Sequence, residues 1–244
     1  MNKIECTSTT IGFVKTAVET AELVGVDSML FRPGLVSGIG GKTGMSVVML
    51  HQHQHELSFD VLGVMNPKDL KVRLALADIK DGSVELDTVQ EKIDQDPIPR
   101  TLVTKMMMKN GRMKISYAAG SPKALRAPRA ITFTEVHQLP MAPNDVAASL
   151  NNATRALLCD ADTTVTLSAS KSELNVTVID KNNDIYEDVV CTLGASAAFS
   201  HRYILNYFLP LIRAQQENVP VVISKEGLLK FCINGFTVYQ LPKV

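Results

Sequence analysis

The sequence lacks several features that would indicate a membrane, secreted or disordered protein. No apolar run reaches the roughly 18 residues that a membrane-spanning helix needs. Residues 1–10 are polar and contain no apolar core of a signal peptide, so we expect the protein to be cytoplasmic. With 45% hydrophobic and 20% charged residues, the composition differs from that of disordered, collagen-like and coiled-coil chains. The 244 residues fit one large domain or two of about 120 residues each.

Metal-binding and redox motifs are also absent. The cysteines form no close pair and are scattered along the chain: Cys6, Cys159, Cys191 and Cys232. We interpret them as buried, reduced thiols of a protein in a reducing compartment. His51, His53 and His55 would share one face of a strand and could chelate a transition metal weakly, but an exposed polar strand face explains them as well. We expect neither a metal nor another cofactor.

The chain shows no enzyme signature. Residues 38–44 resemble a phosphate-binding loop, but the P-loop glycine expected five residues before Gly41 is Val36. The dinucleotide fingerprint would require glycine where Thr43 stands. The segment joins two strand-like runs, and no helix follows whose N-terminus could hold a phosphate. We therefore interpret it as a hairpin and predict a protein that is not an enzyme.

The charges cancel overall but are unevenly distributed. Seven acids and two lysines lie between residues 78 and 96, whereas residues 97–134 contain eight bases and no acid. This pattern fits two solvated faces that balance each other. It fits equally well a basic surface that faces phosphate or an acidic partner.

The periodicity predicts the same order of elements twice. Helices are predicted at residues 9–24 and 66–77 in the first half, and from residue 143 to about 159 in the second. A fourth helix is predicted to begin with Ser200 as its N-cap, and strands lie between and after the helices. Corresponding helices start about 130 residues apart, which indicates an internal duplication. The chain is therefore predicted to be α+β, with domains at 1–125 and 142–244 and a connector at 126–141.

The predicted helices of the second half expose basic rather than acidic side chains. Arg155 lies on a face of small, neutral or basic residues. In the helix after Ser200, Arg202 and Arg213 share a face if the helix continues through Pro210, which could instead end or kink it near Leu209.

In the first half, Lys68 and Lys71 share a face of the short helix. The first helix departs from the pattern, because Lys15 lies beside Glu19 and Glu22.

This layout resembles that of a DNA polymerase sliding clamp, which is built from helix, strands, helix and strands, taken twice. The stretch FSHRYILNYF at 199–208, followed by a hairpin and VYQLPK at 238–243, is similar to the end of proliferating cell nuclear antigen. Residues 58–61 leading into 66–77 have a counterpart in the clamps of large tailed bacteriophages. The resemblance spans the whole chain in element order, but only the last 45 residues are specific.

The resemblance implies two similar clamp-type domains per chain, with helices on one face of antiparallel sheets. Three chains would form a closed homotrimeric ring around double-stranded DNA, without sequence specificity, and tether the replicative DNA polymerase. It implies a clamp loader as a further partner, no membrane, and the cytoplasm of an infected bacterial host. The residues facing DNA would be Lys15, Lys68, Lys71, Arg155, Arg202 and Arg213.

Two further surfaces follow from the resemblance. Client peptides would dock on an apolar surface near the connector and the C-terminus, although ordinary core explains each of its residues equally well: Ile131, Phe133, Val136, Leu139, Leu241 and Pro242. Subunits would join through edge strands at 109–117 and 184–191, with Met113, Ile115, Ile185 and Val189 supplying apolar contact. Their charges are opposite, with Lys109, Arg112 and Lys114 on one strand and Asp184, Glu187 and Asp188 on the other.

Three other functions fit the sequence. The first is a monomeric processivity factor of the same fold, which would bind DNA by a basic face. The second is a nucleotide-binding enzyme that uses residues 38–44. The third is a structural virion protein with a duplicated β-rich fold.

Overall fold

Two compact units make up the chain. The computed structural model describes residues 2–41, 46–78, 82–92, 98–125, 128, 131–139, 143–170, 172–193, 198–216 and 219–243. One unit comprises Met1–Gly40 and Met49–Ala130, and the other comprises Gly41–Val48 and Ile131–Val244. Helices and antiparallel strands occur in both units, which confirms the α+β prediction. None of the helices in the described residues is long and apolar enough to cross a membrane.

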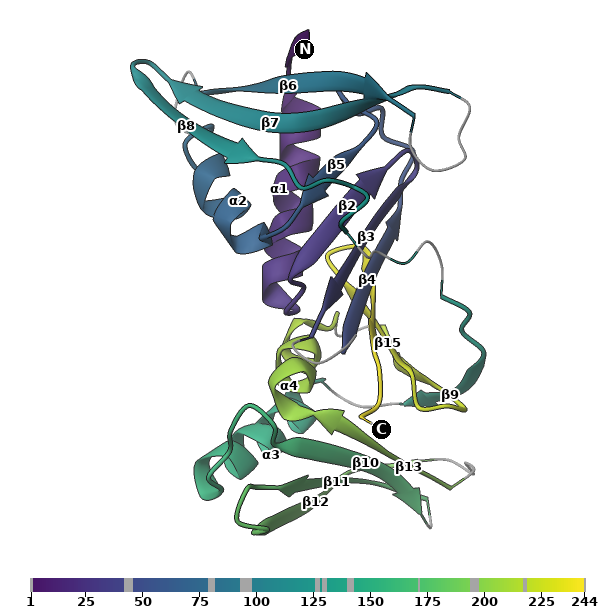
Figure 1. Cartoon of the computed structure of the whole chain (residues 1–244). Helices are drawn as coiled ribbons and strands as arrows, with labels where there is room; N and C mark the ends of the chain where they lie inside the picture. Colours follow the sequence, from purple (N-terminus) through teal and green to yellow (C-terminus); the bar gives the residue numbers. More distant parts are fainter. Residues whose placement is uncertain are drawn as a thin grey trace. The chain divides into compact units, whose positions relative to one another are not determined.

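The first unit alternates strands with two helices. Its elements follow in the order β1 (Asn2–Glu5), α1 (Ser8–Leu23), β2 (Ser28–Arg32), β3 (Leu35–Gly40), β4 (Val47–Gln52), β5 (Leu62–Val64), α2 (Pro67–Leu74), β6 (Ser83–Glu91), β7 (Arg100–Asn110) and β8 (Met113–Ala118). An antiparallel sheet has the order β1-β6-β7-β8. The strands β5-β2-β3-β4 are neighbours in a second sheet. The helices α1 and α2 lie side by side (Figure 1).

The second unit repeats this plan. Its elements are β9 (Glu135–Leu139), α3 (Pro143–Ala156), β10 (Thr164–Ser170), β11 (Glu173–Ile179), β12 (Ile185–Thr192), β13 (Phe199–Ile204), α4 (Leu205–Ala214), β14 (Val221–Ser224), β15 (Leu229–Ile233) and β16 (Phe236–Gln240). One antiparallel sheet has the order β12-β11-β10-β13. The strands β16-β15-β14-β9 are neighbours in the other. The helices α3 and α4 lie side by side (Figure 1).

The two units have the same sequence of elements and the same sheet orders. Each runs strand, helix, four strands, helix and three strands. The order β1-β6-β7-β8 corresponds to β9-β14-β15-β16, and β5-β2-β3-β4 corresponds to β13-β10-β11-β12. The predicted internal duplication is therefore confirmed at the level of architecture. Strand β9 lies within the segment predicted as a connector and pairs with β14.

Local sequence explains where the helices of the first unit begin. The side chain of Thr7 accepts a hydrogen bond from the Thr10 N–H at 3.3 Å and caps α1. Asn66 does the same for α2, accepting from the Asp69 N–H at 3.1 Å, and Pro67 occupies the first helical position. Asn66 and Pro67 are the start signal that the sequence analysis used, and they place α2 as predicted.

The prediction of a helix starting at Ser200 is wrong. Residues 199–204 form β13, which pairs with β10, and their side chains alternate between more and less exposed positions. Tyr203 is fully buried, and its hydroxyl donates a hydrogen bond to the Gly227 carbonyl at 2.6 Å. Helix α4 begins at Leu205 without a side-chain cap and continues through Pro210 to Ala214. The side chains of residues 199–204 alternate as in a strand, and the sequence prediction mistook this segment for the first turn of a helix.

Two glycines of residues 38–44, Gly38 and Gly40, allow close packing of a strand. Gly38 and Gly40 lie in β3, where a Cβ on Gly40 would collide with the carbonyl of Gly25. A Cβ on Gly38 would approach Cγ1 of Val26 to 2.7 Å. The glycines therefore let β3 lie against the segment that follows α1. Residues 42–45 of the predicted hairpin lie outside the described residues.

Candidate functional site

Two arginines in the second unit occupy the ends of neighbouring helices. Arg155 lies in the last turn of α3 and Arg213 in the last turn of α4, and both are exposed. Arg213 Nη2 donates a hydrogen bond to Oδ1 of Asn151. Asn151 lies one turn before Arg155 on the same face of α3. The two guanidinium groups therefore belong to one surface, the α3–α4 arginine pair.

The α3–α4 arginine pair keeps its charge available to a ligand. Within the described residues, neither arginine forms an ion pair. The hydrogen bond to Asn151 orients Arg213 without neutralising it, because an amide has no net charge. An exposed pair of guanidinium groups can contact phosphate groups.

The corresponding helices of the first unit differ, because two of their three predicted DNA-facing lysines bind acids of the same unit. Lys15 Nζ lies 2.5 Å from Oδ2 of Asp78, in the turn after α2. Lys71 Nζ lies 2.6 Å from Oε2 of Glu22 on α1. Hydrogen bonding to these carboxylates raises the pKa of both lysines, so they remain charged but paired. Lys68 is exposed and forms no ion pair within the described residues.

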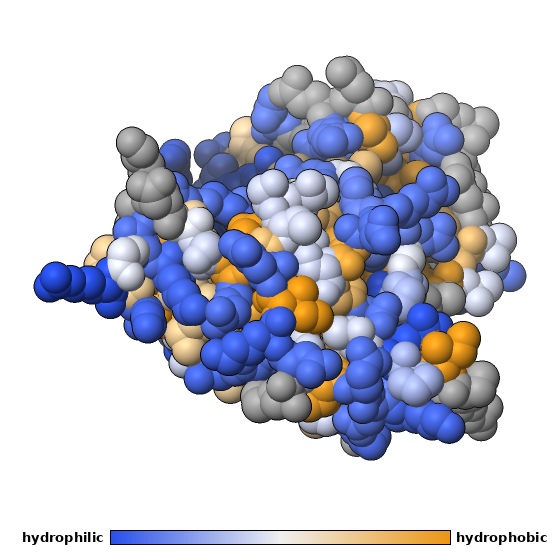
Figure 2. All heavy atoms as spheres, turned by 90° about the horizontal axis from the view of Figure 1, so that it is seen from above, coloured by the Kyte–Doolittle hydropathy of each residue, from blue (hydrophilic) through white to orange (hydrophobic). Residues whose placement is uncertain are grey.

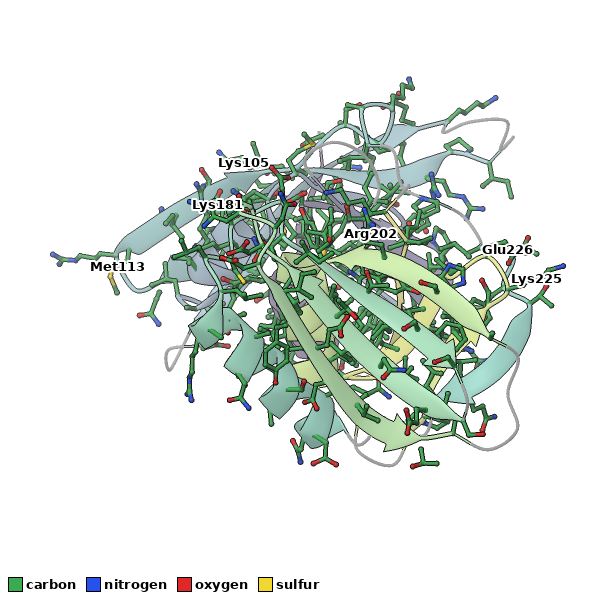
Figure 3. The ribbon with its side chains drawn as sticks, turned by 90° about the horizontal axis from the view of Figure 1, so that it is seen from below. Lys105, Met113, Lys181, Arg202, Lys225 and Glu226 are labelled. Carbon is green, nitrogen blue, oxygen red and sulfur yellow. The ribbon has the colours of Figure 1, made fainter. Side chains whose placement is uncertain are left out.

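Arg202 does not lie on a helix and is removed from the predicted DNA-facing set. It is an exposed residue of β13, opposite Thr166 on β10 (Figure 3). Its neighbour Tyr203 points to the buried side of the sheet, so Arg202 points to the other side. There it lines a hollow of about 390 Å³ with Lys181, Lys243 and acidic residues. No local sequence pattern predicts this hollow, because its residues come from separate strands and the C-terminal segment.

Strand β8 is an edge of its sheet and exposes both apolar and basic residues. Within the described residues it pairs with β7 alone. Met113 and Ile115 are 54% and 40% exposed, and Lys114 and Arg112 are also exposed. Lys109 is not on this edge: it ends β7, and its Nζ lies 2.9 Å from Oε2 of Glu85. That part of the predicted basic edge is wrong.

Strand β12 is an edge of its sheet in the second unit. Within the described residues it pairs with β11 alone. Ile185 and Val189 are 60% and 52% exposed, and Glu187 shares their side of the strand. Asp188 points to the opposite side, beside the buried Val176 on β11.

Asp184 immediately precedes β12. It is exposed, and its backbone N–H donates to the Asp180 carboxylate at 3.0 Å. The acidic charge available on this edge is therefore that of Asp184 and Glu187.

The exposed apolar residues are concentrated on these two edges. The surface in Figure 2 is largely hydrophilic, with apolar side chains in scattered patches. Of the nine large apolar residues that are exposed among the described residues, four lie on β8 and β12. Apolar residues on an open strand edge are typical of a surface that pairs with another strand.

The predicted peptide-docking residues fall into two groups. Phe133 is half-buried, its ring centroid lies 5.6 Å from that of Tyr239, and the Lys230 ammonium lies 5.8 Å from the Phe133 ring centre. Tyr239 and Lys230 were not predicted. Leu139 is 1% exposed and belongs to the core, so it cannot contact a partner.

The other predicted docking residues keep some exposure where they are described. Ile131, Leu241 and Pro242 are half-buried. The side chain of Val136 lies outside the described residues.

The three histidines form a stack rather than an exposed strand face. The rings of His51 and His53 are 6.4 Å apart and those of His53 and His55 are 6.1 Å apart, and all three contact Phe13 of α1. His53 is 9% exposed, and its burial lowers its pKa. No group of three or more potential metal ligands was found in the described part of the chain.

The fold is that of the sliding clamps. The chain matches A. fulgidus PCNA, solved with the C-terminal region of FEN-1, with a TM-score of 0.58 at 12% identity, covering 100% of this chain and 99% of that chain. It matches proliferating cellular nuclear antigen from Entamoeba histolytica with a TM-score of 0.57 at 14% identity, covering 99% and 98%.

A bacterial protein shares the fold over part of its length. DNA polymerase III subunit beta from Borrelia burgdorferi matches with a TM-score of 0.64 at 13% identity, covering 100% of this chain. The chain spans 63% of that longer protein. No protein-family model matches the sequence, and no curated protein matches it.

Proposed function

We propose that this protein is a sliding clamp that encircles duplex DNA as a homotrimer and tethers a DNA polymerase. The observation that carries the proposal is the pair of edge strands β8 and β12, which have one neighbouring strand each in the described sheets, opposite charges and exposed apolar residues. A chain with the clamp fold and two complementary edges can join head to tail with further copies of itself.

The chemistry of the two edges favours pairing with each other over self-pairing. Arg112 and Lys114 would repel a second β8, and Asp184 and Glu187 would repel a second β12. Exposed ion pairs contribute only about 0–1 kcal/mol each. The apolar residues of both strands therefore provide much of the affinity.

The size of the ring follows from the number of units per chain. The resemblance to clamps implies six similar domains around the hole, and each chain has two such units. Three chains meet this number. The matched PCNA chain is covered to 99% by this chain, which supports the same kind of subunit.

In the proposed ring the helices face DNA through phosphate contacts. The α3–α4 arginine pair and Lys68 supply cations without a paired acid among the described residues. Phosphate contacts do not distinguish one DNA sequence from another, so they hold the ring at no particular site. A ring that makes few such contacts binds weakly and can slide along the duplex. A tethered polymerase remains at high effective concentration near the primer end.

Partner proteins would bind the proposed clamp on one surface of the second unit. A polymerase and a clamp loader would dock through short peptides on the surface around Phe133, Leu241 and Pro242. The Phe133 ring against Tyr239 offers an aromatic contact there, and Lys230 offers a cation.

Light scattering across a dilution series tests the ring. We expect three times 26.6 kDa at low micromolar concentration. Arg112→Glu with Lys114→Glu should shift the protein toward monomer, and adding Asp184→Lys with Glu187→Lys should restore part of the trimer. The matched control is Lys225→Glu with Lys243→Glu, which reverses two exposed lysines that follow β14 and β16 and lie outside both edge strands; Lys225 is labelled in Figure 3. A basic-edge variant that remains fully trimeric would show that the interface assignment is wrong.

Retention on circular DNA tests encirclement. We expect the protein to remain on a nicked circular duplex during gel filtration and to leave it when the circle is cut, because a closed ring slides off an open end. Equal retention on circular and linear duplex would favour the monomeric factor that binds DNA by a basic face.

A further inference from the structure

We propose that Glu22 and Asp78 limit the affinity of the clamp for DNA by neutralising Lys71 and Lys15. This inference rests on the proposed function, because it assigns a regulatory role to residues beside the proposed DNA-facing surface. The second unit would provide most of the attraction to phosphate, and the helices of the first unit would slide past DNA with little charge of their own.

The ion-pair geometry supports this role. Both pairs are short, at 2.5 Å for Lys15 with Asp78 and 2.6 Å for Lys71 with Glu22. The four side chains keep between 31% and 44% of their surface exposed, so solvent and phosphate can reach them. The pairs join α1 to α2 and to the turn that follows it. They are therefore part of the helix surface and are not isolated in the core.

A lysine held by a carboxylate contributes little to DNA binding. Binding gains free energy when a cation replaces the counterions condensed on phosphates, and this gain requires a net positive charge at the surface. A lysine–carboxylate pair has none. To reach a phosphate, Lys71 would have to leave Glu22, and the freed carboxylate would then repel the same phosphate.

The ion pairs are not required to hold α2 on α1. Leu70 and Leu74 on α2 and Val14 and Val18 on α1 are buried. Burial of one such aliphatic side chain stabilises a fold by more than an exposed ion pair does. The pairs therefore affect the charge of the surface more than the stability of the helix packing.

Removing the acids tests the inference directly. In Glu22→Gln with Asp78→Asn, both lysines lose their carboxylates while the side-chain shapes remain. We expect affinity for a nicked circular duplex to rise about tenfold at low salt. The slope of log affinity against log salt should steepen by roughly 0.9 for each lysine that reaches a phosphate. Glu173→Gln with Glu226→Gln is the control, because it gives the same net charge at exposed positions off the helices.

A second set of variants shows whether the two lysines produce the gain. Lys15→Gln with Lys71→Gln should abolish the gain in the variant without Glu22 and Asp78. In the wild-type background the same change should lower affinity, because it leaves both carboxylates unpaired and they repel phosphate. Exchanging one pair, with Glu22→Lys and Lys71→Glu, keeps the ion pair and should leave both affinity and thermal unfolding as in the wild type.

The outcomes separate the inference from the proposed function. If the acid-free variant binds no more tightly than the control variant, while wild-type protein is still retained on circles and released by cutting, the inference is wrong and the clamp remains. If neither wild-type protein nor any variant is retained preferentially on circular DNA, the proposed function itself fails. A gain that survives replacement of both lysines would also overturn the inference, because the variant without either acid or either lysine has the wild-type net charge and no freed lysine.

Discussion

The two helix pairs occupy equivalent places in a duplicated architecture, yet they present different charges. In the first unit, Lys15 binds Asp78 in the turn after α2, and Lys71 binds Glu22 on α1. In the second unit, Arg155 and Arg213 have no ion-pair partner among the described residues, and the helices are linked instead by the bond from Arg213 to Asn151.

This difference shows that a basic residue on the correct helix face is not yet a phosphate ligand. Charge pairing within the fold decides whether the cation is available. In the proposed clamp, the second unit would therefore provide most of the attraction to phosphate, and the helices of the first unit would present a nearly neutral surface.

The largest expected effect is a loss of folding stability when a buried leucine is removed, because both helix pairs contain such leucines. Leu150 on α3 and Leu70 on α2 are fully buried. We expect Leu150→Ala and Leu70→Ala each to lower the free energy of unfolding by about 2–5 kcal/mol, because each leaves a cavity. Urea denaturation measures both.

Leu158→Ala is the matched control for the leucines. Its side chain is 61% exposed, so the change should cost less than about 0.5 kcal/mol. A loss below about 1 kcal/mol at Leu150 or Leu70 would mean that the helix faces are assigned incorrectly.

The second prediction separates the helix pairs by charge. Arg155→Ala with Arg213→Ala should weaken retention on circular duplex about tenfold at low salt and reduce the salt slope by roughly 0.9 per lost phosphate contact. Affinity measured at several salt concentrations by fluorescence anisotropy checks both. Folding should be unaffected, since both side chains are exposed.

Lys181→Ala with Arg202→Ala provides the comparison on the other side of the sheet. These two cations line the hollow near β13 and should not contribute to DNA binding. A loss equal to that of the arginine variant would return Arg202 to the DNA-facing set.

The smallest expected effect is a loss of folding stability as the pH falls, and it should be similar in the two units. Burial lowers the pKa of His53 in the first unit and of His201 in the second. For His53, the neighbouring imidazoles of His51 and His55 act in the same direction, and the backbone of Arg32 and His55 acts against it. For His201, Glu226 opposes the shift.

The direction of the pH effect follows from these shifts. Well above pH 6.5 both histidines are neutral in the folded and in the unfolded chain, so neither one lowers the free energy of unfolding. Below this value the unfolded chain takes up protons first, so stability falls as the pH approaches the lower pKa of the folded state. Urea unfolding at pH 7.5, 6.5 and 5.5 measures the decline. His53→Gln and His201→Gln should each make this decline in stability smaller. If the decline is unchanged in both variants, other titratable groups cause it.

Sequence reasoning placed most elements because their signals are local. Asn66 and Pro67 identify the start of α2 without reference to the rest of the chain. The strands β10 and β11 of the second unit are short runs in which buried and less buried residues alternate, which is a local signal as well. The duplication followed from the order of these elements.

The wrong prediction at β13 lies where the alternation of a strand changes directly into the periodicity of a helix. Phe199 to Ile204 alternates as a strand, and the apolar residues from Leu205 onward recur as in a helix. No glycine or helix-capping side chain marks the junction. The pairing of β13 with β10 decides where the strand ends, and that pairing is a contact between segments more than 30 residues apart in sequence.

For the candidate site, the sequence by itself determined the helix positions of the predicted cations other than Arg202, and which segments have opposite charges, because helix periodicity and composition are local properties. Tertiary structure alone decided which cations are available. Lys15 meets Asp78 across 63 residues of chain, and Lys109 meets Glu85 across 24. It also decided that β8 and β12 are edges, since an edge is defined by the absence of a neighbouring strand in the described sheets. Such pairings depend on how segments distant in sequence are brought together by burial of the core, and no local pattern encodes them.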